Sequence, residues 1–478
     1  MSKLSTLILI GLLALAAPAA AAAAEGEKPV DVGSRRELFV DRHLIEKLGG
    51  GAALLLHRPA RREVVLEHDE PWEGNTSGYH TIFKDGDVYR MYYRGWHYLL
   101  KGNEVKDGKE AHPPVVCYAE SQDGVHWTKP ELGLREFRGS KKNNIIWTGA
   151  GTHNFVPFKD ANPKCRPDAK YKAVGGLKRI EGGLVAFKSA DAIHWQRMAE
   201  EPILTDGAFD SQNLVFWDAV RGEYRAYYRD FRNGVRDIKT ATTKDFLQWP
   251  KGRWLAYPGA PTEHLYTNQV QPYDRAPHLF VGFPTRYQPK RGSLVEGLFV
   301  TSRDGRTFHR WGEAIIRPGR NRDRWHNRSN YIWLGLVETK SGLPGGAVEL
   351  SLYSNERYYK GKGVKTRRYT YRPDGFVSVH APLRGGTVLT KPLTFAGKTL
   401  RLNASTSAAG SARVEIRRPN GRPAKGFAAQ DCDVIYGDEL DRVVTWNGKS
   451  DVGSLAGKPV RMLITLKDAD VYSFRFAR

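Results

Sequence analysis

The chain has 478 residues and a formal net charge of +22, and 11% of its residues are aromatic. Its three cysteines, Cys117, Cys165 and Cys432, are far apart and odd in number, which excludes a scaffold built on disulfides. No Cys-x-x-Cys or His-Glu-x-x-His spacing occurs, so we expect no metal site and no cofactor. The basic residues would attract polyanions but are spread along the chain without a nucleic-acid-binding module. We therefore expect no nucleic acid, while an acidic or sulfated polysaccharide and a simply solvated basic surface both stay open.

Residues 1–24 predict a secretory signal peptide. Lys3 precedes an apolar run over residues 7–17, and an alanine-rich stretch suited to cleavage follows. The apolar run is too short to span a bilayer comfortably, and no later segment is hydrophobic enough. We therefore expect a mature chain that begins near Glu25, is secreted or periplasmic, and has no membrane contact after cleavage; a retained membrane anchor is the alternative.

Residues 36–384 predict an all-β domain made of repeats. Tyr, Trp, Val and Thr recur there in short runs that Gly, Asp, Asn and Pro interrupt. Each repeat has the pattern of a four-stranded antiparallel meander, and its last turn carries a heptad of the form Ser/Thr-x-Asp-x-x-x-aromatic. The copies are "SQDGVHW" (121–127), "SADAIHW" (189–195), "TKDFLQW" (243–249), "SRDGRTF" (302–308) and a decayed "SNERYYK" (354–360).

The heptad predicts a hairpin turn and not a catalytic motif. Asp and Asp-Gly tolerate the left-handed backbone of a tight turn, Ser and Asp cap its amides, and the aromatic ring packs between neighbouring sheets. Repeated meanders of roughly 50 to 70 residues predict a β-propeller. We expect five blades, with the strand at 36–45 completing the last blade and closing the ring.

The heptad does not recur in residues 387–478. Short alternating strands separated by "PNGRP", "NGKSD" and "LKDAD" predict a compact β-sandwich there. We expect it to pack against the propeller and stiffen it, with carbohydrate binding as the alternative. The predicted fold class is therefore all-β, a five-bladed β-propeller followed by a small β-sandwich.

These hairpins, the strands of "DGDVYRMYYRG" (85–95) and the blade opening "FDSQNLVFWD" (209–218) resemble the five-bladed propeller glycoside hydrolases. That superfamily includes invertases, levansucrases and arabinanases, and the chain is most similar to its uncharacterised secreted bacterial members. The resemblance implies activity on a carbohydrate. The Asn-Asp-Pro-Asn-Gly, Arg-Asp-Pro and Glu-Cys motifs of invertase-type enzymes are absent, and the heptad lacks the spacing of the sialidase Asp-box, so neither activity is predicted.

Acidic residues at the blade openings are the candidate catalytic groups. The inner strand of each propeller blade begins at the central funnel, so polar residues just before it face a shared cavity. Glycoside hydrolysis needs two carboxyl groups across the scissile bond. We predict Asp210 or Glu73 as nucleophile or base and Glu263 as acid. For each of them, a turn carboxylate or an ion pair with one of the many arginines is the alternative.

The same openings supply candidate substrate-binding side chains. Imidazoles, amides and guanidinium groups recognise sugar hydroxyls and carboxylates, and aromatic rings stack on sugar faces. The candidates are His80, His153, Asn154, Asn213, His264, Tyr266, Arg286, Trp325 and Arg328. Structural hydrogen bonding or core packing is the alternative for each. We therefore expect a secreted glycoside hydrolase that acts on an oligo- or polysaccharide. If the positive charge of the chain serves substrate binding, that substrate is acidic or sulfated. The alternative is a non-catalytic glycan-binding propeller.

Overall fold

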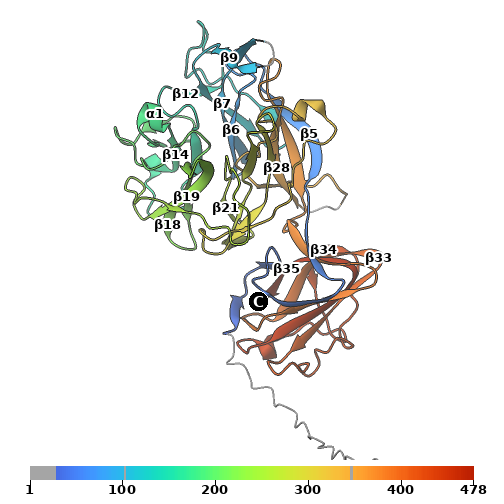
Figure 1. Cartoon of the computed structure of the whole chain (residues 1–478). Coiled ribbons are helices and arrows are strands. Elements are labelled where there is room, and N and C mark those ends of the chain that lie inside the picture. The colour runs from blue at the N-terminus through green and yellow to red at the C-terminus, as the bar shows by residue number, and fades with distance from the viewer. Residues whose placement is uncertain (1–27, 102–103, 345–347) are drawn as a thin grey trace, which may run out of the picture.

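The computed structural model describes residues 28–101, 104–344 and 348–478, so the predicted signal peptide lies outside the described residues. Figure 1 shows a ring of small sheets above a second, C-terminal β body. The helical elements described are short: α1 (Lys178–Glu181) and the 3-10 turns η1 (Pro167–Ala169), η2 (Arg322–Arg324) and η3 (Gly453–Leu455). None of these helices is long and apolar enough to cross a membrane. The predicted all-β class is confirmed.

Five antiparallel sheets form the blades of the propeller. The first blade has strands β6 (Gly78–Asp85), β7 (Val88–Gly95), β10 (Val115–Ser121) and β11 (Trp127–Thr128), and β12 (Ile145–Thr148) also pairs with β10. The second has β13 (Val156–Lys159), β14 (Tyr171–Gly175), β15 (Val185–Ser189) and β16 (Gln196–Arg197). The third has β17 (Leu214–Asp218), β18 (Glu223–Arg232), β19 (Val235–Thr243) and β20 (Arg253–Trp254).

The last two blades complete the ring, so the predicted five-bladed arrangement is confirmed. The fourth has β21 (Gln271–Tyr273), β22 (Ala276–Gly282), β25 (Val300–Ser302) and β26 (His309–Arg310). The fifth has β27 (Val337–Lys340), β28 (Val348–Glu356), β29 (Lys365–Tyr371) and β5 (Ala60–Glu67). Two hairpins stand apart from the blade sheets, β8 (Tyr98–Lys101) with β9 (Glu104–Glu110) and β23 (Thr285–Gln288) with β24 (Leu294–Gly297).

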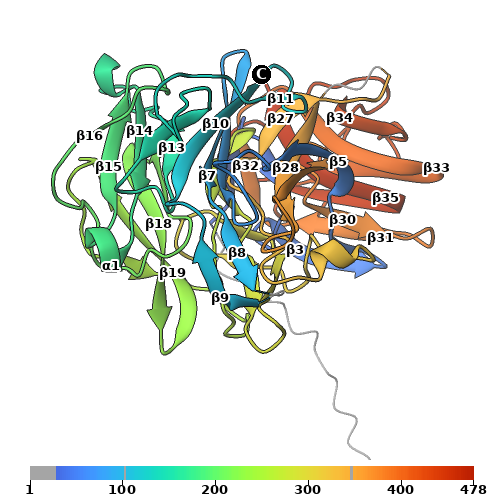
Figure 2. The same ribbon diagram turned by 90° about the horizontal axis from the view of Figure 1, so that it is seen from above.

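An N-terminal strand closes the ring, but it is not the predicted one. β5, drawn in blue, lies at the edge of the fifth blade, beside its orange strands, and pairs with β29 (Figures 1 and 2). Half of the residues of β5 are charged, and they pair across the sheet; for example, Arg368 Nε lies 2.7 Å from Glu63 Oε1. The segment 36–45 instead contributes β2 (Glu37–Leu38) to the C-terminal body, because Phe39 is buried in that body's core.

Four of the heptads form the predicted turns between the third and fourth strands of their blades. In the first copy, Asp123 Oδ1 accepts hydrogen bonds of 2.8 Å from the amides of Val125 and His126. The aromatic ring packs against the preceding blade, as Trp195 does against Tyr92 of the first blade with ring centroids 6.3 Å apart. The decayed fifth copy is not a turn, because its first three residues lie within β28.

The C-terminal body is the predicted sandwich, enlarged by N-terminal strands. It contains β1 (Val30–Gly33), β2, β3 (Ile45–Gly50), β4 (Ala53–Leu56), β30 (Val377–Ala381), β31 (Gly386–Thr390), β32 (Leu393–Phe395), β33 (Thr399–Arg417), β34 (Asp438–Val443) and β35 (Arg461–Ala477). The long strands β33 and β35 carry register shifts that let the sheet bend over its own apolar core.

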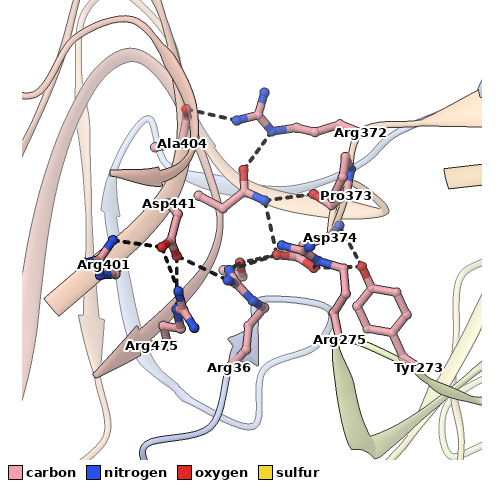
Figure 3. A network of polar contacts seen from close by, with 12 residues as sticks. Arg36, Tyr273, Arg275, Arg372, Pro373, Asp374, Arg401, Ala404, Asp441 and Arg475 are labelled. Atoms are coloured by element: carbon pink, nitrogen blue, oxygen red, sulfur yellow. Dashed lines mark hydrogen bonds and ion pairs between the residues drawn. The ribbon is translucent and has the colours of Figure 1, made fainter. Parts of the chain in front are cut away.

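A buried polar network joins the two bodies (Figure 3). The carboxylate of Asp374 accepts hydrogen bonds from Tyr273 Oη at 2.7 Å and Arg275 Nε at 2.9 Å, both in the propeller. It also accepts hydrogen bonds from Arg36 at 3.1 Å and Ser473 Oγ at 2.6 Å, both in the C-terminal body. Burial acts to raise the pKa of Asp374, but Arg275 and Arg36 outweigh it and lower that pKa. The contacts therefore fix the sandwich against the propeller.

Candidate functional site

A cavity of about 470 Å³ opens where the inner strands of the propeller begin. Its lining residues include Lys178 and Arg179 of α1 and Tyr98 of the β8–β9 hairpin. Both elements lie at the end of the ring remote from the C-terminal body (Figure 1). Its described lining is aromatic and cationic: Tyr79, Arg94, Trp96, Tyr98, His153, Leu177, Lys178, Arg179, Ala208, Asp210, Phe231, Tyr266, Arg328, Tyr331, Tyr358 and Tyr359.

The backbone is strained around this cavity. Tyr79, Arg328 and Tyr359 line it with positive φ angles of 54°, 56° and 56°, and Phe209, next to Asp210, has φ 59°. Residues with a bulky side chain rarely adopt this left-handed conformation, and such strain gathers at functional sites. In this protein, the strained residues lie in the segments that supply the lining side chains of the cavity.

Buried amides hold the loop that carries Asp210. Asn154 Nδ2 donates hydrogen bonds to the carbonyl oxygens of Phe209 and Ser211 at 2.6 and 2.7 Å, and Asn213 Nδ2 donates to the same two oxygens at 2.9 and 2.8 Å. Both asparagines are at most 1% exposed and are not part of the cavity lining. We predicted them as sugar ligands, but these contacts make them positioning residues for Asp210.

Asp210 is the one carboxylate among the described lining residues, and it forms an ion pair with Arg229. Its side chain is 45% exposed, whereas that of Arg229 is fully buried. The guanidinium carbon of Arg229 lies 4.7 Å from the ring centroid of Phe231 and 5.1 Å from that of Tyr266. Asp210 is therefore held at the wall of the cavity with one face open to a ligand.

Two lining arginines have no carboxylate partner among the described residues. Arg94 is 3% exposed; it donates hydrogen bonds to Tyr358 Oη at 2.8 Å and to the carbonyl oxygen of Thr76 at 3.0 Å. Arg328 donates to Tyr359 Oη at 3.1 Å. Buried charges in proteins are normally paired, so uncompensated guanidinium groups beside a cavity favour an anionic ligand. Lys178 and Arg179 add exposed positive charge at its rim.

The tyrosines of the cavity differ in acidity. Burial acts to raise the pKa of Tyr266, but the guanidinium groups of Arg328 and Arg229 outweigh it and lower that pKa below its usual value of 10. Burial and the neighbouring Tyr266 raise the pKa of Tyr331 well above 10. The two ring centroids are 5.6 Å apart. The cavity thus contains a more acidic and a less acidic hydroxyl side by side.

His153 is neutral in this environment. Burial, together with the nearby charge of Arg94, lowers its pKa well below 6.5. Its Nδ1 lies 3.3 Å from Arg94 Nη1, which donates to it when the ring proton is on Nε2. Of the predicted residues, Asp210, His153, Tyr266 and Arg328 therefore meet in one cavity.

Glu73 lies away from the cavity, in a closed polar cluster. Its carboxylate accepts hydrogen bonds from Tyr93 Oη at 2.5 Å and Lys129 Nζ at 2.7 Å, and it is 1% exposed. Burial acts to raise the pKa of Glu73, but His68 and Lys129 lower it to about 2. Every described contact of this carboxylate is with another protein group, and Glu73 is not among the lining residues.

Glu263 also lies outside the cavity. Its carboxylate oxygens are 3.4 Å from Arg286 Nη1 and 3.2 Å from Arg310 Nη2. The three predicted acids thus do not converge, because arginines of the neighbouring strands hold Glu263 and a buried cluster holds Glu73.

The remaining predicted ligands make structural contacts outside the cavity lining. His80 is fully buried and stacks on Trp333, with ring centroids 4.6 Å apart. His264 Nδ1 accepts a hydrogen bond from the amide of Arg236, and Arg286 pairs with Glu296. Trp325 is 57% exposed and donates its Nε1 hydrogen to the carbonyl oxygen of Gly319.

A repeated sequence pattern supplies residues that we did not predict. Arg94 is the third residue of "YYRGW" and Arg229 is the third residue of "YYRDF"; each lies in the second strand of its blade, two residues before an aromatic ring. The second strand runs antiparallel to the first, so its end reaches the level at which the first begins, and Gly78 pairs with Arg94. The pattern was visible in the sequence as an internal repeat.

A second cavity, of about 630 Å³, lies where the inner strands end. Several of its charged groups form ion pairs: Asp218 with Arg221, and Arg275 with Glu338 and Asp374. None of the predicted site residues lines it. No cluster of three or more His, Cys, Asp or Glu side chains able to hold a metal ion occurs in the part of the chain that the structure describes.

No family model matches the chain. Uncharacterized protein Rv1502 of Mycobacterium tuberculosis is 26% identical over 168 residues, which make up 34% of this chain and only 44% of that protein. Similar solved structures include a thermostable family-43 glycoside hydrolase, at 15% identity over 65% of this chain and 95% of the other, with a TM-score of 0.42. The α-L-arabinofuranosidase PaAbf62A from Podospora anserina is 8% identical over 66% of this chain and 97% of the other, with a TM-score of 0.44. These sequence identities and TM-scores are too low to establish the fold. The fold assignment is therefore based on the strand pairing within the chain itself.

Proposed function

We propose that the protein binds an acidic carbohydrate in the cavity at the start of the inner strands and cleaves one of its glycosidic bonds there. The observation that carries this proposal is the pair Arg94 and Arg328, which line the cavity without a carboxylate partner among the described residues. A sugar carboxylate or sulfate would supply the missing charge by hydrogen bonds to both guanidinium groups.

The rest of the lining suits a sugar. Tyrosine hydroxyls and neutral His153 offer hydrogen bonds to sugar hydroxyls, while Trp96 and Phe231 offer ring surface. Asp210 is the carboxylate in reach of a bound sugar, and we propose it as a reacting or hydroxyl-binding group. Hydrolysis by two carboxylates finds little support, because the described lining contains one.

Secretion belongs to the same proposal, since polysaccharides of this kind are met outside the cytoplasm. The support is the sequence of residues 1–24. Sequencing the N-terminus of the protein exported by its own host tests it. A start near Glu25 supports export, and a retained Met1 on the exported or cytoplasmic protein contradicts cleavage.

The test is a panel of polysaccharides in matched pairs, each acidic polymer beside its carboxyl-reduced or desulfated form, with product chains measured by mass spectrometry. We expect shortening of an acidic member only, and Arg328→Gln should raise KM roughly 10-fold or more, the effect of losing one charged hydrogen bond. Arg286→Gln is the matched control, because it removes an arginine that does not line the cavity and is paired with Glu263 and Glu296.

A second candidate is a glycan-binding propeller without activity, which the presence of a single carboxylate in the described lining favours. Binding of an acidic oligosaccharide that depends on Arg328, with no product from any polymer, would support that candidate and overturn cleavage. Equal activity on the acidic and neutral members of a pair would overturn the acidic substrate.

A further inference from the structure

We propose that this cavity cleaves a 4-linked uronic acid polysaccharide by β-elimination, with Tyr266 as the base, Tyr331 as the acid and Arg328 as the partner of the substrate carboxylate. The inference rests on the proposed function and adds the substrate class and the chemistry.

Elimination needs groups that this cavity contains and needs no second carboxylate. A cation must neutralise the carboxylate on C5, a base must remove the C5 proton, and an acid must protonate the leaving oxygen on C4. Hydrolysis by paired carboxyl groups needs two of them, and the described lining has Asp210 alone. The lining instead supplies arginines and a group of tyrosines.

Three guanidinium groups surround the ring of Tyr266. The guanidinium carbons of Arg229, Arg236 and Arg328 lie 5.1, 5.5 and 5.7 Å from its ring centroid. These charges favour its phenolate form, as the lowered pKa of Tyr266 also indicates. In the structure its Oη donates a 3.4 Å hydrogen bond to the carbonyl oxygen of Asp210, so the hydroxyl lies at the loop that carries this residue.

Tyr331 has the properties of the acid. It lines the cavity, is 1% exposed, and its Oη has no hydrogen-bond partner among the described residues. A buried hydroxyl without a partner costs free energy unless a ligand completes it. Its ring contacts that of Tyr266, and the pKa values of the two hydroxyls are displaced in opposite directions. Such a divergent pair is the usual arrangement of a base and an acid.

The proposed reaction balances without water. The Tyr266 phenolate takes the C5 proton, and the electrons of the C–H bond form a double bond between C4 and C5. The C4–O bond breaks, its electron pair stays on the oxygen, and that oxygen takes the proton of Tyr331. Arg328 stabilises the extra negative charge on the carboxylate while the C5 proton leaves. Afterwards Tyr266 loses its proton to solvent and Tyr331 regains one.

The experiment digests 4-linked uronic acid polymers in water enriched in heavy oxygen and records ultraviolet absorbance and product mass together. We expect a new absorbance from the double bond conjugated with the carboxylate, and products without heavy oxygen. Products that carry heavy oxygen and no double bond would overturn elimination while leaving the proposed function intact. Absence of cleavage of every acidic polymer would instead overturn the proposed function, and the inference with it.

Two conservative variants test the roles of the tyrosines. Tyr266→Phe and Tyr331→Phe keep the rings and should each lower kcat roughly 100-fold or more, with KM changed only a few-fold. Tyr287→Phe is the control, because Tyr287 packs beside Tyr266 but does not line the cavity, and it should keep kcat within about 2-fold. In the wild type, kcat should rise with pH through the lowered pKa of Tyr266, and a Tyr266→Phe variant with unchanged kcat would overturn the assignment of the base.

Discussion

Arg94 and Arg229 occupy equivalent positions in the first and third blades, yet among the described residues only Arg229 has a carboxylate partner, Asp210. Each lies near the end of the second strand, and each stacks on the aromatic side chain two residues later, Trp96 or Phe231. One arginine is therefore compensated within the protein and the other is not. This asymmetry is the physical basis for an anionic ligand in the cavity.

Removal of the partner carboxylate should cost stability. In Asp210→Asn, the buried Arg229 loses its counter-charge, and we expect the free energy of unfolding to fall by about 1 to 2 kcal/mol, less than for a fully buried pair because Asp210 is half exposed. Chemical denaturation measures this change.

Glu263→Gln alters an ion pair outside the cavity and should leave activity within about 2-fold of the wild type. A catalytic loss equal to that of Asp210→Asn would contradict our assignment of the site.

Affinity for the acidic ligand should fall as salt rises. The described part of the lining has four cationic side chains, Arg94, Lys178, Arg179 and Arg328, and two of them lie at the exposed rim. Salt screens such exposed charges. Calorimetric titration of an acidic oligosaccharide at low and high ionic strength should show weaker binding at high salt, and a salt-independent affinity would mean that the ligand makes no charged contact.

Glu73 should matter for folding and not for catalysis. Its pKa is about 2 in the folded protein against 4.5 ordinarily, so its stabilising effect is present above about pH 4.5 and is lost as the pH falls toward 2. This lowering of the pKa of Glu73 corresponds to about 3 kcal/mol of folding free energy at neutral pH. Unfolding of Glu73→Gln should show this loss at pH 7 and little difference from wild type near pH 2, while the folded variant keeps its kcat.

Asp374 should couple the two bodies. Asp374→Asn removes the buried counter-charge that the half-buried Arg36 and Arg275 share, and we expect a loss of about 3 kcal/mol, as for one partner removed from a buried pair. Differential scanning calorimetry should then resolve two transitions, one for each body. A single transition at the wild-type temperature would show that the network contributes nothing to their union.

The repeated turns permit a paired test of backbone strain. Gly124 and Ala192 hold the same heptad position with φ of 75° and 73°. Gly124→Ala should destabilise the protein by about 1 to 2 kcal/mol or more, because a Cβ there would meet Thr339 Cγ2 at 2.8 Å. Ala192→Gly should be neutral or stabilising by about 1 kcal/mol, as measured by thermal unfolding.

The propeller could be predicted because its turns are local. Ser121, Asp123 and Gly124 build a turn from their own hydrogen bonds, so the heptad identifies it wherever it occurs. β5 could not be found in this way, because half of its residues are charged, which is untypical of a strand. Their partners lie about 300 positions away in the sequence, as Arg368 does for Glu63. Ring closure depends on such distant pairing.

The candidate site could be predicted in part. Tyr266 and Arg328 precede inner strands, so the strand order alone brings them to the cavity. Glu73 also precedes an inner strand, but its backbone turns back, with its amide donating to the carbonyl oxygen of Glu70, and its side chain enters a buried cluster. Which way a side chain leaves a loop depends on tertiary contacts that no sequence spacing encodes.

The most direct test of the central claim is product analysis of an acidic polysaccharide and of the same polymer after its carboxyl groups have been reduced to alcohols. With wild-type protein, we predict shortened chains from the acidic polymer alone, and about 10-fold or more weaker turnover at low substrate with Arg328→Gln. Equal shortening of both polymers, or no shortening of any acidic polymer by the folded protein, would contradict it.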